Sequence, residues 1–242
     1  MTLLPSERAP GLHVAPGVVV PDDAQIAPYV TIYAGVELGS GVSIEQGAIL
    51  GRSQQIDARS RSPRRAGEGV TSIGDGCRVG SNTVVVAGAR IGRRSYLGDH
   101  VLVRETAVIG EEVMVGRGAV LSHDTTVGDR TRIQNDVLVG PWTYIAEDVL
   151  VAPRVTFVGD PTMGRRSADA VSDGIVVRRA CRIGIAAIIF QGVEVGEEAV
   201  IGAAAMVRAD VAPHTVVVGI PARPLRAVGE EELLETWRRE TG

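Results

Sequence analysis

Imidazoles are the side chains of this sequence best suited to take up a proton near neutral pH, because an unperturbed imidazole has a pKa of about 6.5. The chain has four of them: His13, His100, His123 and His214. Such a group can act as a general base, for example towards an amine that must lose a proton as it attacks a carbonyl carbon. A three-histidine zinc site with two ligands close in sequence has no counterpart here, so we expect no bound metal.

The four histidines occupy different settings. His13 lies in an opening turn and His214 in the exit segment, where solvated side chains are expected, whereas His100 and His123 lie within a long regular block. Asp124 follows His123 directly, and a carboxylate beside an imidazole raises its pKa or fixes its tautomer. General-base and purely structural roles for His123 are both open at this point.

The composition describes the scaffold that must hold these residues. Hydrophobic residues make up 45% of the 242 positions but aromatic residues only 3%, so small aliphatic side chains must fill a narrow interior. Thirty glycines spread along the chain indicate a recurring turn. A net charge of −4 excludes a general attraction to nucleic acid or to an anionic membrane. With two cysteines, no leader pattern and no apolar run long enough to cross a bilayer, we expect a cytoplasmic protein without a membrane span.

Aliphatic residues recur at every sixth position over most of the chain. One block runs from Val14 to Leu50, a second from Ile73 to Phe157 and a third from Val177 to Val207. They contain 28 such positions in all. An α-helix would scatter these residues over three faces, because six residues advance the helix by about 240° beyond a full turn, whereas a strand keeps them on one face.

The repeat predicts an all-β parallel β-helix. Gly, Asp or Asn occurs in most hexads, so the chain turns after each short strand, and three strands with three turns close a coil of about 18 residues. The 28 hexads then give about nine coils. Residues one coil apart stack about 4.8 Å from one another, which places Glu105 directly below His123 and stacks Asn135 in a column with Arg117. A β-sandwich that imitates the period is the less favoured alternative.

Two polar segments interrupt the repeat, at residues 52–72 and 158–176, and must project from the β-helix. Residues 1–228 are therefore predicted to form one β-helix domain. Residues 229–242 have Leu233, Leu234 and Trp237 at helical spacing, with acids early and arginines late. We expect a short C-terminal helix that caps the last coil, since a solenoid otherwise leaves an open sheet edge.

The hexads IGEEVM, VGRGAV and VGDRTR share an aliphatic first residue and a small or β-branched fifth residue. This pattern resembles the hexapeptide signature of left-handed β-helices, and the chain is similar to the hexapeptide acyltransferases, most closely to those that acetylate amino groups of nucleotide-linked sugars. Four stretches carry the resemblance: residues 42–53 with the Arg-rich segment after them, 121–134, 155–166 and 203–228. The resemblance implies left-handedness, acetyl-CoA as co-substrate, and a homotrimer with sites between subunits.

Some residue roles follow from the same resemblance, and those of Glu105, Asp124 and Asn135 follow from their places in the repeat. The segment SHD is similar to one in which related transferases carry a catalytic histidine, which favours His123 over His100 as the general base, with Glu105 behind it. Relatives with Asn in this segment leave a different base or substrate-assisted chemistry open. Asn135 is a candidate to hydrogen-bond a sugar or acyl oxygen, or else serves a turn through its αL tolerance. Asp124, Asp160 and Arg165 are candidates for substrate binding, with Arg165 paired to a diphosphate.

Coenzyme A is expected along the final coils, where small residues let the pantetheine arm approach backbone amides. The candidates are Gly184, Ala186, Gly202, Ala204 and Ala205, with Arg208 and Arg223 for the phosphates. In the first polar segment, Arg52, Arg59, Arg61, Arg64 and Arg65 could serve the substrate anion or form plain surface. An O-acetyltransferase, a transferase of another acyl group and a non-catalytic assembly protein are the alternatives.

Overall fold

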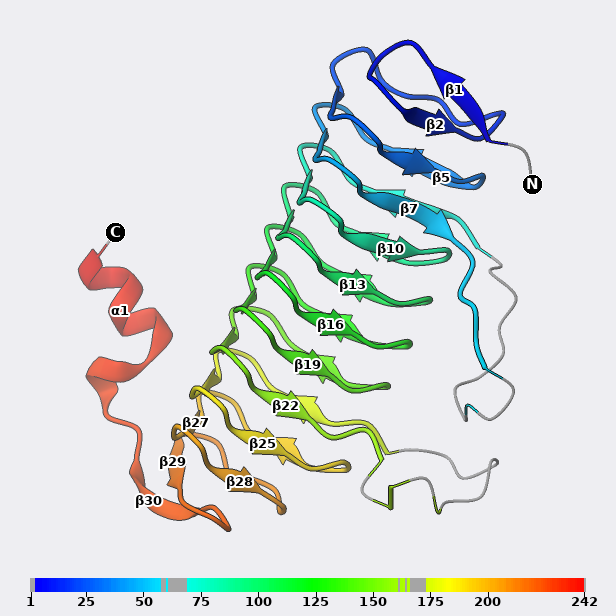
Figure 1. The fold of residues 1–242 in the computed structure, drawn as a ribbon. Helices are drawn as coiled ribbons and strands as arrows, with labels where there is room; N and C mark the ends of the chain where they lie inside the picture. Colours follow the sequence, from blue (N-terminus) through cyan, green and yellow to red (C-terminus); the bar gives the residue numbers. More distant parts are fainter. Residues whose placement is uncertain are drawn as a thin grey trace.

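The protein is a three-sided prism of stacked coils (Figure 1), seen in a computed structural model that describes residues 3–57, 60, 69–160, 162–163, 165 and 173–241. The chain runs through three sheets in the repeating order B, A, C, so each coil adds one strand to each sheet. We call the edges of the prism the A/B, A/C and B/C corners, after the two sheets that meet there. The fold class predicted from the repeat is confirmed.

Each sheet consists mainly of two- and three-residue parallel strands. Sheet A contains β1 (Leu4–Ser6), β2 (Leu12–Val14), β4 (Thr31–Ile32), β7 (Ile49–Arg52), β10 (Val84–Val86), β13 (Leu102–Val103), β16 (Val120–Leu121), β19 (Leu138–Val139), β22 (Thr156–Phe157), β25 (Ile188–Ile189) and β28 (Met206–Val207). Sheet B contains β3 (Gln25–Ile26), β6 (Ser43–Ile44), β9 (Arg78–Val79), β12 (Tyr96–Leu97), β15 (Met114–Val115), β18 (Arg132–Ile133), β21 (Leu150–Val151), β24 (Arg182–Ile183), β27 (Val200–Ile201), β29 (Thr215–Val218) and β30 (Arg223–Ala227). Sheet C contains β5 (Val36–Leu38), β8 (Thr71–Ile73), β11 (Arg90–Ile91), β14 (Val108–Ile109), β17 (Thr126–Val127), β20 (Tyr144–Ile145), β23 (Val176–Val177) and β26 (Glu194–Val195).

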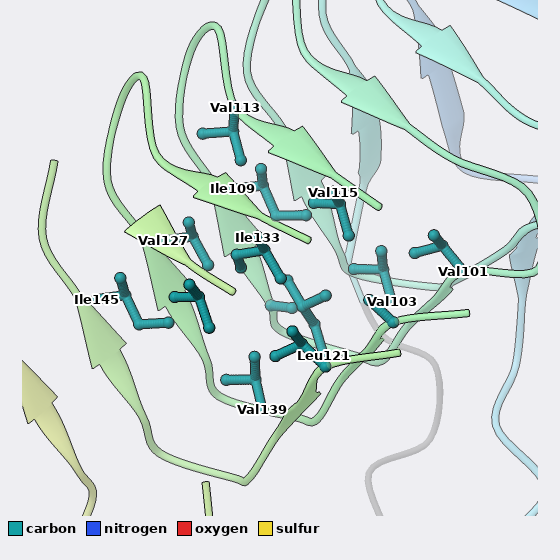
Figure 2. Packing of buried hydrophobic residues seen from close by; sticks show 14 of the residues in the cluster. Val101, Val103, Ile109, Val113, Val115, Leu121, Val127, Ile133, Val139 and Ile145 are labelled. Carbon is teal, nitrogen blue, oxygen red and sulfur yellow. The ribbon is translucent and has the colours of Figure 1, made fainter. Parts of the chain in front are cut away.

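The second residue of a typical strand points into the prism and the first points out. Ile109, Val127 and Ile145 come from successive strands of sheet C and point inward (Figure 2). Leu121 and Val139 meet them from sheet A, and all five side chains are buried. Small aliphatics suit this interior because three strands converge on it from three sides. The repeated aliphatic position is therefore the core position, as predicted.

The predicted coil length is confirmed in the central block, where Leu102 pairs with Val120 and Val120 with Leu138. Ten described strands run parallel in sheet A and ten in sheet B, so the prediction of about nine coils was one too low. The final coil is shorter than those of the central block, since Val200 pairs with Val216. That shortening breaks the six-residue phase and hid the last coil from the sequence pattern.

Antiparallel strands close both ends of the prism. β1 pairs with β2 at the first coil, and β30 pairs with β29 at the last. Such strands cover backbone groups that an open sheet edge would leave unpaired. The role expected of the C-terminal helix is thus taken at the last coil by β30.

The C-terminal helix lies along the flank of the prism, so the prediction that it caps the last coil was wrong (Figure 1). A 3₁₀ turn (η1, Glu230–Glu232) precedes α1 (Leu234–Thr241). Arg238 Nη2 lies 2.6 Å from Asp148 Oδ1, the Leu234 N–H donates to Glu198 Oε1 at 3.1 Å, and Glu235 pairs with Arg179. Asp148, Arg179 and Glu198 come from three successive coils at the B/C corner, so ion pairs set the path of α1.

Both predicted excursions leave the prism at the A/C corner. The chain departs after β7 and returns at β8, and it departs again after β22 and returns at β23. Each excursion leaves from sheet A and returns to sheet C. The turn that contains His123 makes the same connection, from β16 in sheet A to β17 in sheet C. His123 thus lies between the two excursions on this corner. Along sheet A, the first excursion leaves three strands before β16 and the second leaves two strands after it.

Candidate active site

His123 lies in the turn that crosses the A/C corner between β16 and β17. Its side chain is 4% exposed, and Nδ1 lies 2.9 Å from Asp124 Oδ2. Asp124 adopts φ = 57°, the left-handed turn conformation that Asp tolerates better than most residues. With Nδ1–H donating to the carboxylate, Nε2 is the nitrogen that can accept a proton.

Asp124 is itself held in place by Thr106 from the preceding coil. The Thr106 hydroxyl donates to Asp124 Oδ1 at 2.8 Å and accepts the Asp124 backbone N–H at 3.1 Å. Asp124 was predicted to contact substrate, but one of its carboxylate oxygens is bonded to His123 and the other to Thr106. The contacts observed for the Asp124 carboxylate are thus those that orient the imidazole.

Trp142 covers His123 from the following coil. The two ring centroids lie 4.8 Å apart in an edge-to-face arrangement with an interplanar angle of 87°. Trp142 lies 18 residues after Asp124, so the 18-residue repeat places it in the coil next to the His123 turn. An indole at this place shields the imidazole from water on one side and restricts its rotation.

Glu105 occupies the predicted place in the coil before His123, because β13 and β16 pair with an offset of one coil. However, its carboxylate is bound by Arg104, with Nη2 to Oε1 at 2.6 Å and Nε to Oε2 at 3.1 Å. Both side chains are largely buried, at 14% exposure for Arg104 and 5% for Glu105. Of the two carboxylates predicted beside His123, Asp124 accepts the hydrogen bond from the imidazole, and Glu105 acts on it through its charge.

Burial sets the protonation state of His123. Loss of solvent lowers its pKa, the hydrogen bond to Asp124 raises it, the nearby Arg104 charge lowers it, and Asp124 and Glu105 raise it by their charge. The net effect is a pKa below 6.5. The carboxylates raise this pKa as predicted, but burial lowers it by more. A neutral imidazole at pH 7 is the form that accepts a proton.

Asn135 does not reach His123. It lies in the turn between β18 and β19 at the A/B corner, and its Oδ1 accepts the backbone N–H of Arg117 at 3.0 Å. The residue with positive φ in that turn is Asp136, so αL tolerance does not explain Asn135. Asp99 Oδ1 makes the equivalent bond to the N–H of Ser81 in an earlier turn of the same corner. The observed contact of Asn135 is thus one of a series that links successive turns.

The candidate glycines and alanines for the cofactor divide between the A/B corner and the core. Gly184 and Ala186 follow β24, and Gly202 and Ala204 follow β27, so all four lie at the A/B corner. Ala186 and Ala204 are exposed and adopt positive φ, and their small side chains keep this edge low. Ala205 is fully buried in the core, so the prediction that it faces the cofactor was wrong.

Arg208 and Arg223 line one hollow of about 520 Å³ at the C-terminal end. Arg208 follows β28 at the A/C corner, and its guanidinium stands 5.1 Å from the centre of the Phe190 ring. Arg223 lies in β30 and is exposed. Strand β30 runs antiparallel to β29 and places Arg223 at the same hollow as Arg208. The sequence named both arginines as candidates for the cofactor phosphates.

The remaining candidates lie on the second excursion or outside the described residues. Asp160 follows β22 at the A/C corner and accepts the backbone N–H of Thr162 at 2.8 Å. Arg165 is exposed beyond it. Arg52 belongs to β7, whereas the other four arginines of the first polar segment are not among the described residues: Arg59, Arg61, Arg64 and Arg65.

A larger hollow of about 780 Å³ lies over sheet C and the B/C corner, lined by Tyr144, Arg178 and Glu194 among others. It holds none of the predicted residues. Within the part of the chain that the structure describes, no three His, Cys, Asp or Glu side chains gather as a metal site. No described helix is long and apolar enough to cross a bilayer.

Residues 71–105 and 106–140 match the family model for the bacterial transferase hexapeptide, which spans six repeats. Residues 174–209 match the model for the hexapeptide repeat of succinyl-transferase. These parts of the chain are therefore similar to the hexapeptide repeats of bacterial transferases. These matches cover the coils that carry Glu105, His123 and the A/B corner at Gly184.

Two curated proteins and one solved structure resemble this chain over the following ranges. An acetyltransferase of Schizosaccharomyces pombe is 47% identical over 49 residues, covering 20% of this chain and 24% of that protein. The 2,3,4,5-tetrahydropyridine-2,6-dicarboxylate N-acetyltransferase of Enterococcus faecalis is 37% identical over 70 residues, covering 27% and 30%. The chain thus covers less than a third of either relative. The solved UDP-N-acetylglucosamine acyltransferase of Bacteroides fragilis has a TM-score of 0.52 at 18% identity, covering 97% of this chain and 71% of that one, and so shows a shared fold.

Proposed function

We propose that this hexapeptide-repeat protein is an acyltransferase that moves the acetyl group of acetyl-CoA to an amine of a small acceptor, with His123 as general base. The observation that carries the proposal is the buried His123–Asp124 pair beneath Trp142, at the corner from which both excursions leave. A neutral, oriented imidazole is the group that amine acylation requires. The acetyltransferase names of the curated relatives support the reaction class.

In the proposed reaction, the acceptor amine donates a hydrogen bond to Nε2 of His123. As the amine nitrogen attacks the thioester carbonyl carbon, Nε2 takes its proton and the carbonyl electrons move to oxygen. The tetrahedral species then collapses, expels the thiolate and restores the carbonyl, and the imidazolium returns its proton to the sulfur. Asp124 stabilises the imidazolium through Nδ1, and Thr106 keeps the carboxylate in line.

The acceptor in this proposal is an amino sugar, most simply one linked to a nucleotide. Support comes from the sequence resemblance, from the position of Asp160 on the same corner as His123, and from the exposure of Arg165 on the excursion that leaves there. A guanidinium fork suits a diphosphate. A flat flank encloses a ligand poorly, so the proposal includes a homotrimer with sites between subunits.

The test measures thiol release from acetyl-CoA against a panel of nucleotide-linked amino sugars and simple hydroxyl acceptors. We expect turnover with an amino sugar and a loss of about 10²- to 10⁴-fold in kcat for His123→Ala. His100→Ala is the matched control, since His100 lies in an exposed turn at the A/B corner, and it should keep wild-type turnover.

Three outcomes would contradict the proposal. Equal kcat for His123→Ala and wild type, with both folded, would remove His123 from the reaction. Turnover with hydroxyl acceptors alone would replace the amine acceptor by an O-acetylated one. The absence of any calorimetric heat with coenzyme A or acetyl-CoA would favour a non-catalytic assembly protein.

A further inference from the structure

A small hollow lies between sheet B and the C-terminal segment, on the flank opposite the A/C corner. Its volume is about 190 Å³. Two arginines of sheet B and four residues of the C-terminal segment line it: Arg132, Arg182, Glu231, Glu232, Leu234 and Trp237. It shares no residue with the His123 site or with the hollow of Arg208 and Arg223. The hollow therefore has no part in the chemistry proposed for His123.

The two arginines belong to one column on the outer face of sheet B. Arg132 is the first residue of β18, and Arg182 is the first residue of β24. Arg132 pairs with Leu150 of β21, and Leu150 pairs with Arg182. Two strand spacings place the backbones of the arginines about 10 Å apart. Two long side chains span such a gap from both sides, so one small ligand can contact both guanidinium groups.

The Arg182 guanidinium is fixed by the backbone and not by a carboxylate. Its Nη1 donates to three backbone carbonyl oxygens at 2.8, 3.1 and 3.2 Å, those of Asp148, Ala180 and Cys181. Nε and Nη2 make no hydrogen bond to a described residue. The nearby Arg178 and Arg179, by contrast, are paired with Glu194 and Glu235. The carbonyls thus hold Arg182 in place and leave its other N–H groups for a ligand.

The surroundings of Arg182 leave its positive charge poorly compensated. Burial lowers its pKa, the Glu198 charge raises it, and the Arg132 charge lowers it. The Glu198 carboxylate already accepts the N–H of Leu234. An arginine stays protonated in a protein, so both guanidinium groups are cations at neutral pH. A buried charge without a partner is costly, and an anion between the two arginines would relieve that cost.

The two glutamates of the hollow do not neutralise the arginines. Glu232 accepts both Nη groups of Arg226, at 2.5 and 2.9 Å, and the Gly229 N–H at 2.9 Å. The Glu231 carboxylate lies against Gly229. Within the described chain, neither glutamate forms an ion pair with the two arginines of sheet B. The hollow is thus a place where positive charge awaits an external partner.

We propose that this hollow binds a phosphate group between Arg132 and Arg182, with the half-exposed Trp237 indole as its apolar wall. Two cations match the charge of a phosphate, which is largely a dianion at pH 7. The planar fork of a guanidinium suits the oxygens of a phosphate. The volume corresponds to about six water molecules of the liquid, enough for a phosphate or a short phosphate monoester with bridging water and too small for a nucleotide.

The test is isothermal titration calorimetry of the full chain with inorganic phosphate, glycerol 3-phosphate and acetate in separate arms. We expect one phosphate per chain with a Kd of about 1 mM or tighter, and at least about tenfold weaker binding of the singly charged acetate. The tighter of the two phosphate compounds identifies the source of the group. The tryptophan emission should also change, and that change should vanish in Trp237→Phe, which leaves Trp142 as the emitter.

Three variants test the assignment of residues. Arg132→Gln and Arg182→Gln should each weaken phosphate binding by about ten- to hundredfold, because each removes a charged hydrogen-bond donor. Glu231→Gln should tighten it by about two- to fivefold, because it removes a like charge from the rim. Arg78→Gln is the matched control: Arg78 is the first residue of β9 in the same column, but lies over Tyr96. It should bind phosphate as wild type does.

Heat that does not saturate by about 10 mM phosphate would overturn the inference. Equal binding of acetate, or wild-type affinity in Arg132→Gln shown by circular dichroism to be folded, would do the same. Loss of the heat with coenzyme A in the arginine variants would assign these arginines to the cofactor and so also contradict a separate site. If neither arginine variant folds, Glu231→Gln decides, since unchanged or weaker phosphate binding there would contradict the electrostatic account.

Discussion

Replacing Asp124 by Asn isolates the electrostatic contribution of the carboxylate to His123. The Asn side chain has the same shape, so its Oδ1 can still accept the imidazole Nδ1–H and its amide can still face Thr106. What disappears is the negative charge 2.9 Å from Nδ1. Because the carboxylate favours the protonated imidazole, its removal moves the pKa of His123 further below 6.5.

The size of the effect follows from the hydrogen bond. A hydrogen bond to a charged partner contributes about 1.5–3 kcal/mol and a neutral one about 0.5–1.5 kcal/mol. The Asp124 side chain is 20% exposed, so solvent screens little of the difference. A loss of about 1.4 kcal/mol in the transition state, where His123 becomes cationic, lowers kcat about tenfold. KM for the acceptor should change little, since Asp124 faces the imidazole.

The pKa is measured without any substrate, from the NMR titration of the imidazole protons, with His123→Gln used to assign the signal. The acid limb of the kcat profile gives the second measurement. Thr106→Val is the companion variant: it frees the carboxylate to move but keeps its charge, so we expect a smaller fall in kcat. A pKa of His123 that rises or stays constant in Asp124→Asn would refute the reasoning, and so would a wild-type kcat.

Two further predictions concern stability. Ile133→Ala should lower the free energy of unfolding by about 2–5 kcal/mol, because Ile133 is fully buried between coils and a cavity remains, as urea titration would reveal. Asp148→Asn should cost about 1–3 kcal/mol. Burial raises the pKa of Asp148, but Arg130 and Arg238 outweigh it and hold the pKa below 3.8. The Asp148 contribution is thus present at neutral pH and is lost as the pH falls through that lowered pKa, so wild type and variant should converge in acid; a constant difference would contradict this account.

The sequence by itself determined the coil and its register. A six-residue aliphatic period leaves the chain only one way to bury Ile109, Val127 and Ile145 together, and that fixed the offset of one coil between Glu105 and His123. The choice of His123 came from resemblance, and the structure gives it the burial and the partner that a base needs.

Only the tertiary structure decided which side chains meet at the corners. The two excursions lengthen their coils well beyond the regular repeat, so that Ile49 pairs with Val84 and Thr156 pairs with Ile188. The break in the repeat marks where each excursion begins and ends, but it does not show to which sheet the chain returns, so the corner that carries Gly184 relative to His123 was not accessible from the sequence.

The partner of the imidazole was settled in the same way. The 18-residue repeat and the chain order place both Glu105 and Asp124 next to His123. The left-handed turn at Asp124 directs its carboxylate at Nδ1, whereas the Glu105 carboxylate is bound by Arg104. The path of α1 depends on Asp148 and Glu198, which are remote in sequence. Periodic burial is a local property of the chain, whereas ion pairs and turn contacts exist only after distant coils have been stacked.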